Sequence, residues 1–203
     1  MKKDYPIIGI AGSNGSGKDT VAAMLAERFN FFSASATQML GDELVRQDKP
    51  TSRKNKAALS ASWRKQYGKS AIVDRAIEEY EEHHGEKTGM CVGSLRHPGE
   101  ALKVQELGGI VVWTDAEARV RYERVSAVKR EGREHEDMLG FDEWLADELR
   151  EMEHHSGDDT TLSVGAVKDL RDITIANNKN DIEAFKDQAE VAVRDYIESY
   201  SKR

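Results

Sequence analysis

The sequence predicts an α/β fold, a three-layer sandwich in which helices cover both faces of a five-stranded parallel sheet. Apolar residues such as Val21, Met24 and Leu25 recur with the 3.6-residue period of amphipathic helices between short apolar runs. Short buried strands that alternate with helices are typical of a parallel sheet. A glycine-rich loop between the first strand and the first helix supports the same fold. The predicted strands are Pro6–Ala11, Phe31–Ala34, Gly89–Val92, Ile110–Thr114 and Ile173–Ala176.

The glycine-rich loop has the G-x-x-x-x-G-K spacing of a phosphate-binding P-loop, which predicts a P-loop NTPase fold. Backbone N–H groups must curl around an anion here, and glycine leaves room for its approach. The helix that begins near Lys18 directs its positive end toward the same anion, and the Lys18 ammonium can bridge the β- and γ-phosphates of a nucleotide. The predicted ATP-binding loop is Gly12, Ser13, Asn14, Gly15, Ser16, Gly17, Lys18, Asp19 and Thr20.

The loop departs from the usual pattern at the residue that follows its lysine. Most P-loops have Ser or Thr there to hold magnesium, whereas this chain has Asp19, followed by Thr20. The strand at Gly89–Val92 also lacks the carboxylate that often helps to hold the metal. Two interpretations are open. Either Asp19 supplies the missing charge to Mg²⁺, or Asp19 caps the helix and Asp115, after the next strand, serves the metal.

Composition limits the classes of function that the chain can have. Its 203 residues fit a single domain, 1–203, and no apolar run is long enough to span a bilayer. We expect a cytoplasmic protein without a secretory signal, and one cysteine, Cys91, fits a reducing compartment and a buried strand. The net charge of −7 argues against bulk binding of nucleic acid.

Two polar stretches interrupt the alternation of strands and helices. The first, Asp48–Ala61, precedes a short predicted helix that ends at Tyr67-Gly68, within an acceptor-binding region predicted at about 35–85. The second, Lys129–Gly140, is too polar for the core and is predicted to be a small lid, about 129–140, that closes over phosphates. A charged, solvated helix end is the alternative for this second stretch.

Arginines are the candidates for chemistry, because phosphoryl transfer needs positive charge around the migrating group and guanidinium binds phosphate bidentately. Arg96 follows a predicted strand and should project into the P-loop crevice. Arg46 and Arg64, with Arg53 near them, are candidates to grip an acceptor phosphate. The predicted helix 116–130 adds further cations, of which we expect one or two to face the nucleotide: Arg119, Arg121, Arg124 and Arg130, with Arg133 just beyond.

With these residues in place, the chain resembles the nucleoside monophosphate kinase branch of P-loop kinases. The G-x-x-x-x-G-K-D-T loop looks like that of bacteriophage deoxynucleoside monophosphate kinases and phosphomevalonate kinases. The segment 95–101 and the following Leu107-Gly108-Gly109 are similar to the phage enzymes. The order of motifs is also similar to an archaeal group of dephospho-CoA-kinase-like and cytidylate-kinase-like proteins. Two departures from that group are Gly93-Ser94, where it has Asp-Gly, and Ala146, where it has arginine.

The resemblance implies roles for individual residues. Lys18, Arg96 and Arg130 would act on the transferred group, Arg46 and Arg96 would hold the acceptor phosphate, and Arg124, Arg130 or Arg133 would close over the donor phosphates. Asn177 and Asn178 would lie near the adenine.

The expected activity is ATP- and Mg²⁺-dependent transfer of the γ-phosphoryl group to a nucleoside or deoxynucleoside monophosphate. The expected partners are ATP and a phosphorylated small-molecule acceptor. No membrane association is expected, and the sequence does not decide between a monomer and a homodimer. Two alternatives are a dephospho-CoA kinase and an ATP-dependent switch or assembly factor that has no small acceptor.

Overall fold

The computed structural model describes residues 2–83, 85–128, 139–152 and 160–201. Its sheet has five parallel strands in the order β2-β3-β1-β4-β5. This confirms the predicted α/β fold, and each strand lies within one residue of its predicted bounds. The strands are β1 (Ile7–Gly12), β2 (Phe32–Ser35), β3 (Met90–Gly93), β4 (Ile110–Asp115) and β5 (Ile173–Ala176).

Strand β1 occupies the centre of the sheet because its side chains are apolar on both faces. Ile7, Ile8, Ile10 and Ala11 are fully buried. At the carboxyl end, Ile10 is in register with Gly93 of β3, and Gly12 is in register with Thr114 of β4. The P-loop therefore leaves the sheet between the ends of two neighbouring strands, where open parallel sheets bind ligands.

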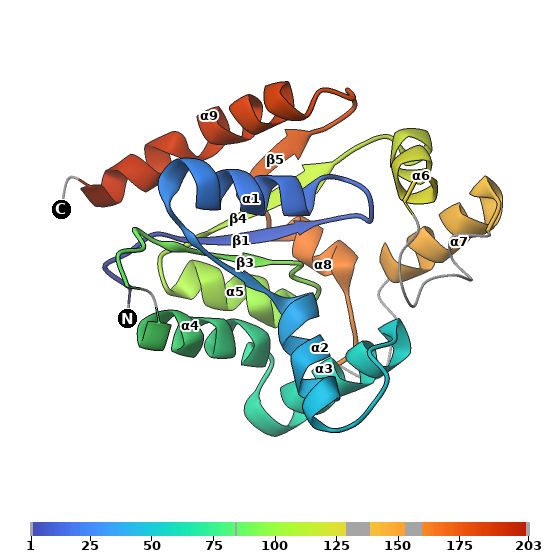
Figure 1. Ribbon diagram of the computed structural model, residues 1–203, viewed down its shortest axis with the longest axis horizontal. Helices are drawn as coiled ribbons and strands as arrows, with labels where there is room; N and C mark the ends of the chain where they lie inside the picture. The colour runs from blue at the N-terminus through green and yellow to red at the C-terminus, as the bar shows by residue number, and fades with distance from the viewer. Residues whose placement is uncertain (1, 84, 129–138, 153–159, 202–203) are drawn as a thin grey trace.

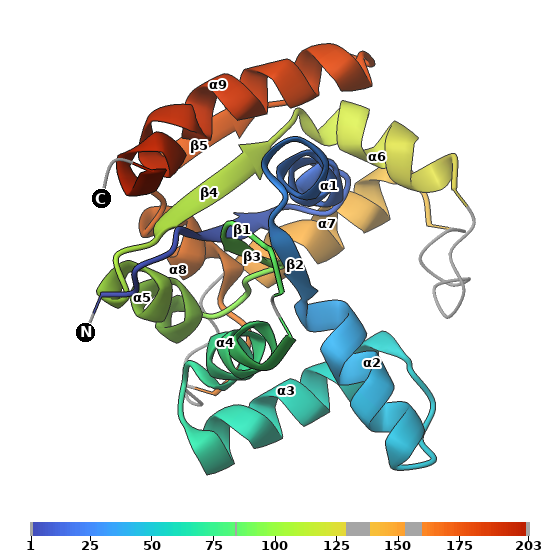
Figure 2. The same cartoon turned by 60° about the vertical axis from the view of Figure 1, so that its left-hand side comes forward.

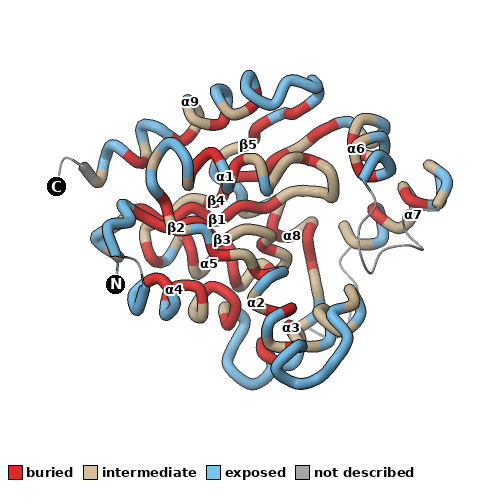
Figure 3. The backbone as a smooth tube through the Cα atoms, viewed as in Figure 1, coloured by how far each residue is buried: buried red, intermediate tan, exposed pale blue. Residues whose placement is uncertain are grey.

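Helices cover both faces of the sheet (Figure 1). On one face lie α1 (Lys18–Phe29) and α9 (Ile182–Ser201), and on the other lie α4 (Ala71–His83), α5 (Pro98–Glu106) and α8 (Val164–Asp169). Each face has its own apolar core. Buried residues concentrate along the strands between these helices, as Figure 3 shows.

Four further helices lie around the carboxyl ends of the strands (Figure 2). They are α2 (Ala36–Arg46), α3 (Arg53–Tyr67), α6 (Ala118–Ser126) and α7 (Phe141–Met152). Helix α3 corrects the prediction of a short helix after a polar stretch, since it already begins at Arg53. The Ser52 side chain caps it by accepting from the Asn55 N–H, and Trp63 buries its apolar side.

The predicted lid falls on residues 129–140, of which 129–138, with Arg130 and Arg133, lie outside the described residues. Within the described parts of the chain, no helix is long and apolar enough to cross a bilayer. Cys91 is fully buried in β3, and burial raises the pKa of its thiol to about 11, in agreement with a packing role.

The last helix is tied to the first strand by a tyrosine. The Tyr196 hydroxyl of α9 accepts the Ile7 N–H at 3.0 Å and lies 3.1 Å from the Ile7 carbonyl. It also lies 3.2 Å from the Gly108 carbonyl. These contacts hold the amino end of β1, so the strand is fixed at the end opposite to the P-loop.

Candidate functional site

The P-loop backbone is held by its own residues and by the end of β5. Gly17, the N-cap of α1, has a φ of 103°, and a Cβ there would lie 2.5 Å from Asn177 Nδ2. Asn177 donates to the Ser16 carbonyl at 3.0 Å, and the buried Ser16 hydroxyl lies 2.7 Å from Thr114 Oγ1. Among the described residues no side chain caps the start of α1, so its N–H groups can receive an anion.

Lys18 is folded back onto the loop that carries it. Its Nζ donates to the carbonyls of Gly12 at 2.9 Å and Ser13 at 2.7 Å. Burial, and then the nearby charge of Arg96, lower the pKa of Lys18 to about 8. A phosphate at the loop would favour the charged ammonium, so anion binding and protonation of Lys18 favour each other.

A cavity of about 900 Å³ lies beside the P-loop. Lys18, Asp19 and Thr20 line its middle. The first end is lined by α6, by the segment that joins β5 to α9 and by the start of α9, including Arg124, Asn177, Lys179, Ile182 and Phe185. The second end is lined by the carboxyl ends of β2 and β3, including Ser35, Thr37, Ser94 and Arg96.

Among the α6 arginines, Arg124 lines the cavity. It donates to the Lys179 carbonyl at 2.8 Å, to Asn177 Oδ1 at 3.3 Å and to the Gly15 carbonyl at 3.4 Å. Burial lowers its pKa. Arg119 instead stacks on the Phe141 ring at 3.9 Å. The structure thus brings together Lys18, Arg124 and Asn177, all three of which were predicted to bind ATP.

Arg96 lies at the second end because the chain turns sharply after β3. Ser94 takes a φ of 65°, which few non-glycine residues adopt, and the turn leads to α5. The buried Glu100 carboxylate accepts the Arg96 N–H at 2.8 Å and the His97 N–H at 3.1 Å. Glu100 therefore fixes the backbone from which the Arg96 side chain extends.

A second, smaller pocket of about 100 Å³ adjoins this end and shares Thr37, Ser94 and Arg96 with the large cavity. Arg53 and Lys56 of α3 also line it, together with alanine, leucine and hydroxyl side chains. Three cations thus surround a space only large enough for part of a small molecule. From the sequence, Arg53 was named only as a neighbour of the acceptor candidates, and Lys56 was not singled out for this role.

Arg64, predicted to hold the acceptor, lies beneath this pocket and does not line it. It is 3% exposed, its Nε donates to the Thr160 carbonyl at 3.1 Å, and its Nη1 lies 3.8 Å from Glu100. Burial raises the pKa of Glu100 and lowers that of Arg64, while their opposite charges act against both shifts. Arg64 therefore supports Glu100, and through it the Arg96 turn.

Arg46, the other predicted acceptor ligand, is exposed at the end of α2 and pairs with Glu43 at 2.8 Å. It lines a different hollow, together with Trp63 and Arg75. Sequence periodicity cannot distinguish these two arginines from Arg53, because it does not specify how α2 and α3 turn relative to the sheet.

The two candidate metal acids have different surroundings. Asp19 is exposed in the first turn of α1 and lines the large cavity, and Gly17 rather than Asp19 is the N-cap. Asp115 accepts from the Ala116 N–H at 3.0 Å and pairs with Lys168 at 3.3 Å. In the described ranges no three acidic, histidine or cysteine side chains cluster to hold a metal. Asp19 and Thr20 line the large cavity beside Lys18, whereas Asp115 is not among the residues that line it.

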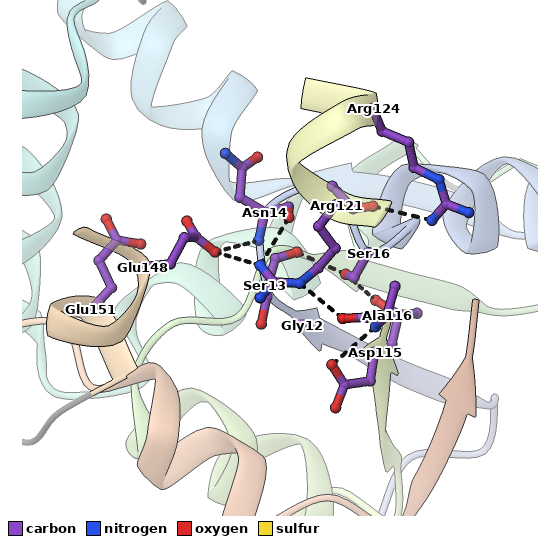
Figure 4. Close-up of polar contacts among 12 residues, drawn as sticks. Gly12, Ser13, Asn14, Ser16, Asp115, Ala116, Arg121, Arg124, Glu148 and Glu151 are labelled. Carbon is purple, nitrogen blue, oxygen red and sulfur yellow. Dashed lines mark hydrogen bonds and ion pairs between the residues drawn. The ribbon is translucent and has the colours of Figure 1, made fainter. Parts of the chain in front are cut away.

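Two acids of α7 reach the site, and neither was predicted from the sequence (Figure 4). Glu148 Oε2 accepts the Asn14 N–H at 3.3 Å and pairs with Arg121 at 2.8 Å, while Glu151 pairs with Arg96 at 3.4 Å and contacts Arg53. The available signal was helical spacing, since residues 144, 148 and 151 share the face that carries a buried tryptophan. Acids on a buried face need partners.

Comparisons with known proteins agree with this architecture. No protein-family model matches the chain. The UPF0200 protein MMP1282 of Methanococcus maripaludis is a distant relative, 23% identical over 182 residues that cover 89% of this chain and 92% of that protein. A shikimate kinase from Bacteroides thetaiotaomicron has a similar structure, with a TM-score of 0.60 at 13% identity, over 93% of this chain and 98% of that one.

A gluconokinase from Sinorhizobium meliloti 1021 is also similar in structure, with a TM-score of 0.51 at 14% identity, over 98% of this chain and 97% of that one. The chain therefore has the fold of P-loop small-molecule kinases. The likeness is one of fold, and the acceptor has to be inferred from the site.

Proposed function

We propose that the protein is an ATP- and Mg²⁺-dependent kinase that transfers a γ-phosphoryl group to a small anionic acceptor. The observation that carries this proposal is the junction of two spaces. The large cavity beside the P-loop and the small cationic pocket share Thr37, Ser94 and Arg96. A donor on the P-loop and an acceptor in the pocket would therefore meet at Arg96.

The donor would bind along the large cavity. Lys18 and the loop N–H groups would hold its phosphates. Arg124 and Asn177 border the end at which the nucleoside would lie, and Ile182 and Phe185 offer apolar surface for a base. When bound, Mg²⁺ near Asp19 and Thr20 would neutralise negative charge on the phosphates.

The acceptor would bind through its own negative charge. Arg53, Lys56 and Arg96 converge on the small pocket, and arginine and lysine at such positions favour phosphate or carboxylate. The sequence resemblance favours a nucleoside or deoxynucleoside monophosphate. Shikimate kinase and gluconokinase are named for two other acceptors, so compounds of those classes belong in the same test.

Arg96 has a second task at the junction. In-line phosphoryl transfer spreads negative charge over the migrating group, and a guanidinium next to it stabilises that charge without changing protonation. Lys18 lies on the donor side of the same group. The protein supplies position and positive charge and does not need to supply a covalent intermediate.

The test is release of ADP from ATP and Mg²⁺ with a panel of acceptors: ribo- and deoxyribonucleoside monophosphates, dephospho-CoA, shikimate and gluconate. We expect one acceptor to stimulate turnover well above water, and Arg96→Ala to abolish this stimulation. Arg46→Ala is the matched control, since Arg46 is exposed and lies outside both spaces. A flat panel with slow hydrolysis would contradict the kinase and favour an ATP-dependent switch.

A further inference from the structure

Helix α7 places negative charge where the proposed function requires phosphate to bind. Glu148 accepts the N–H of Asn14, a residue of the P-loop itself, at 3.3 Å. A carboxylate and a phosphate are both oxyanions that accept from backbone N–H groups, so they compete for one donor. The close approach of two anions would also be repulsive.

The contact of Glu148 is built into the core of the site. Glu148 and Arg121 pair at 2.8 Å with both side chains only 10% exposed. Arg121 is itself fixed, because its Nε donates to the Ala116 carbonyl at 3.0 Å and its Nη1 lies 3.3 Å from the Asn14 carbonyl. Arg121 therefore holds the carboxylate against the loop, as Figure 4 shows.

Glu151, one turn further along α7, places a second carboxylate against the cations of the acceptor side. It pairs with Arg96 at 3.4 Å and contacts Arg53, and both of these arginines line the small cationic pocket. Glu151 is about 29% exposed, so water reaches this pair and it is weaker than the buried one. One helix thus carries an internal anion for each of the two sites.

We propose that Glu148 and Glu151 are internal substitutes for the substrates' anionic groups, which must displace them in order to bind. This inference rests on the proposed function. Without substrates, the two carboxylates neutralise cations that would otherwise repel one another. When a donor binds the P-loop, the Asn14 N–H donates to its phosphate instead of to the Glu148 carboxylate, and α7 shifts as a unit.

Because both acids lie on one rigid helix, displacement of the first loosens the contact of the second. Donor and acceptor should then each improve the affinity for the other, and linkage makes this effect equal in both directions. Trp144 of α7 packs on Tyr122 of α6 at 5.6 Å between ring centroids and lies 5.1 Å from the Arg121 guanidinium. This tryptophan therefore reports on the position of α7 beside the site.

The test compares wild type with Glu148→Gln, Glu151→Gln and the control Asp142→Asn. The glutamine variants keep size and a hydrogen-bond acceptor but lose the charge. Asp142→Asn removes the same charge from an exposed position of the same helix. We expect Glu148→Gln to bind ATP about tenfold more tightly, a typical size for coupling between sites, and Asp142→Asn to match wild type.

Equal or weaker ATP binding by Glu148→Gln would overturn the inference, since that is the result expected if Glu148 only positions Arg121 for the ligand. Wild type that binds no ATP at all would instead overturn the proposed function.

The second readout is Trp144 emission in a background with Trp63→Phe and Trp113→Phe. In this background we expect ATP to change the emission of the protein that keeps Glu148. With Glu148→Gln added, the emission without ATP should already be closer to that of the ATP-bound protein. Emission that does not respond to bound ATP would contradict a shift of α7.

Glu151→Gln provides an independent test should Glu148→Gln not fold. With inorganic phosphate as the probe, we expect about fivefold tighter binding than in wild type, a size typical of weak coupling. Unchanged or weaker phosphate binding would overturn the role of Glu151, with thermal unfolding as the check that the variant is folded.

Discussion

The two ends of the site are built in different ways. The phosphate-binding part of the donor end is one run of consecutive residues, Gly12 to Thr20, which the centre of the sheet positions. A hydrogen bond within the loop and contacts to the ends of β4 and β5 hold it. The acceptor end takes Thr37 from α2, Arg53 and Lys56 from α3, and Arg96 from the turn after β3. The phosphate-binding loop of the donor end depends on local conformation. The acceptor end depends on ion pairs between residues that are far apart in the sequence.

Removal of the donor-end cation should have the largest effect. We expect Lys18→Ala to lower phosphoryl transfer about 100- to 1,000-fold, as loss of a preorganised charge near the migrating group does elsewhere. Thermal unfolding should change little. Lys65→Ala, on the exposed side of α3, is the control. Turnover that survives Lys18→Ala would show that the donor does not use the P-loop.

At the acceptor end, loss of a buried cation should instead lower the stability of the folded protein. Arg64→Met leaves the Glu100 charge buried without its partner, and we expect a loss of about 3 kcal/mol in the free energy of unfolding. Urea unfolding measures it. The double variant Arg64→Met with Glu100→Gln should recover most of the loss, because the amide oxygen still accepts from the Arg96 and His97 N–H groups. Arg46→Met, which breaks an exposed pair, should cost under about 0.5 kcal/mol.

The pH dependence of that loss follows from the sign of the Glu100 shift. Burial raises the pKa of Glu100 in the folded protein, and removal of Arg64 raises it further. A raised carboxyl pKa favours the folded state below the unfolded pKa, and this benefit is lost as the pH rises through the folded pKa. Arg64→Met should therefore cost more stability at pH 8 than at pH 5. The opposite order would mean that Glu100 is not the buried partner.

A further prediction concerns protonation at the donor end. Lys18 has a pKa lowered to about 8, and bound phosphate raises it, so binding above pH 8 must take up a proton. ATP affinity should be level below pH 8 and fall about tenfold per pH unit above it. Calorimetry in two buffers of different ionisation enthalpy measures the proton. Lys18→Arg should abolish the dependence, and an unchanged slope in that variant would assign it to another group.

The smallest expected effect distinguishes the two candidate metal acids. Asp19→Ser should raise the Mg²⁺ concentration for half-maximal turnover about fivefold, equivalent to about 1 kcal/mol for an exposed charge. Asp115→Asn should leave it unchanged, because Asp115 pairs with Lys168 outside the cavity lining. The reverse result would restore the alternative in which Asp115 serves the metal.

The sequence predicts the donor end well because its information is local. Strands of apolar residues, a glycine spacing and an amphipathic helix each depend on neighbours in the chain. The strands accordingly lie within one residue of their predicted bounds, and the first helix begins at Lys18. Arg46, Arg53 and Arg64 look alike in the sequence, since all are cations near helix ends. Their different positions follow from the packing of α2 and α3, which local periodicity does not encode.

The acids of α7 were not predicted for a related reason. A glutamate in a charged helix is usually solvated, and nothing in its local sequence reports that Glu148 lies against Asn14, 134 residues earlier. The buried Trp144 on the same face was the available indication. Charged partners that are distant in sequence can be recognised only after the fold is known.

The Tyr196 hydroxyl also bears on how the chain folds. It joins α9 to Ile7 across 189 residues, and β1 lies between β3 and β4, both made long after it. The central strand therefore has no sheet partner during much of synthesis, and its apolar faces need protection until then. Such non-local pairing gives a high contact order, which slows folding. The P-loop can take its final shape only late, when the strands on both sides of it have been added.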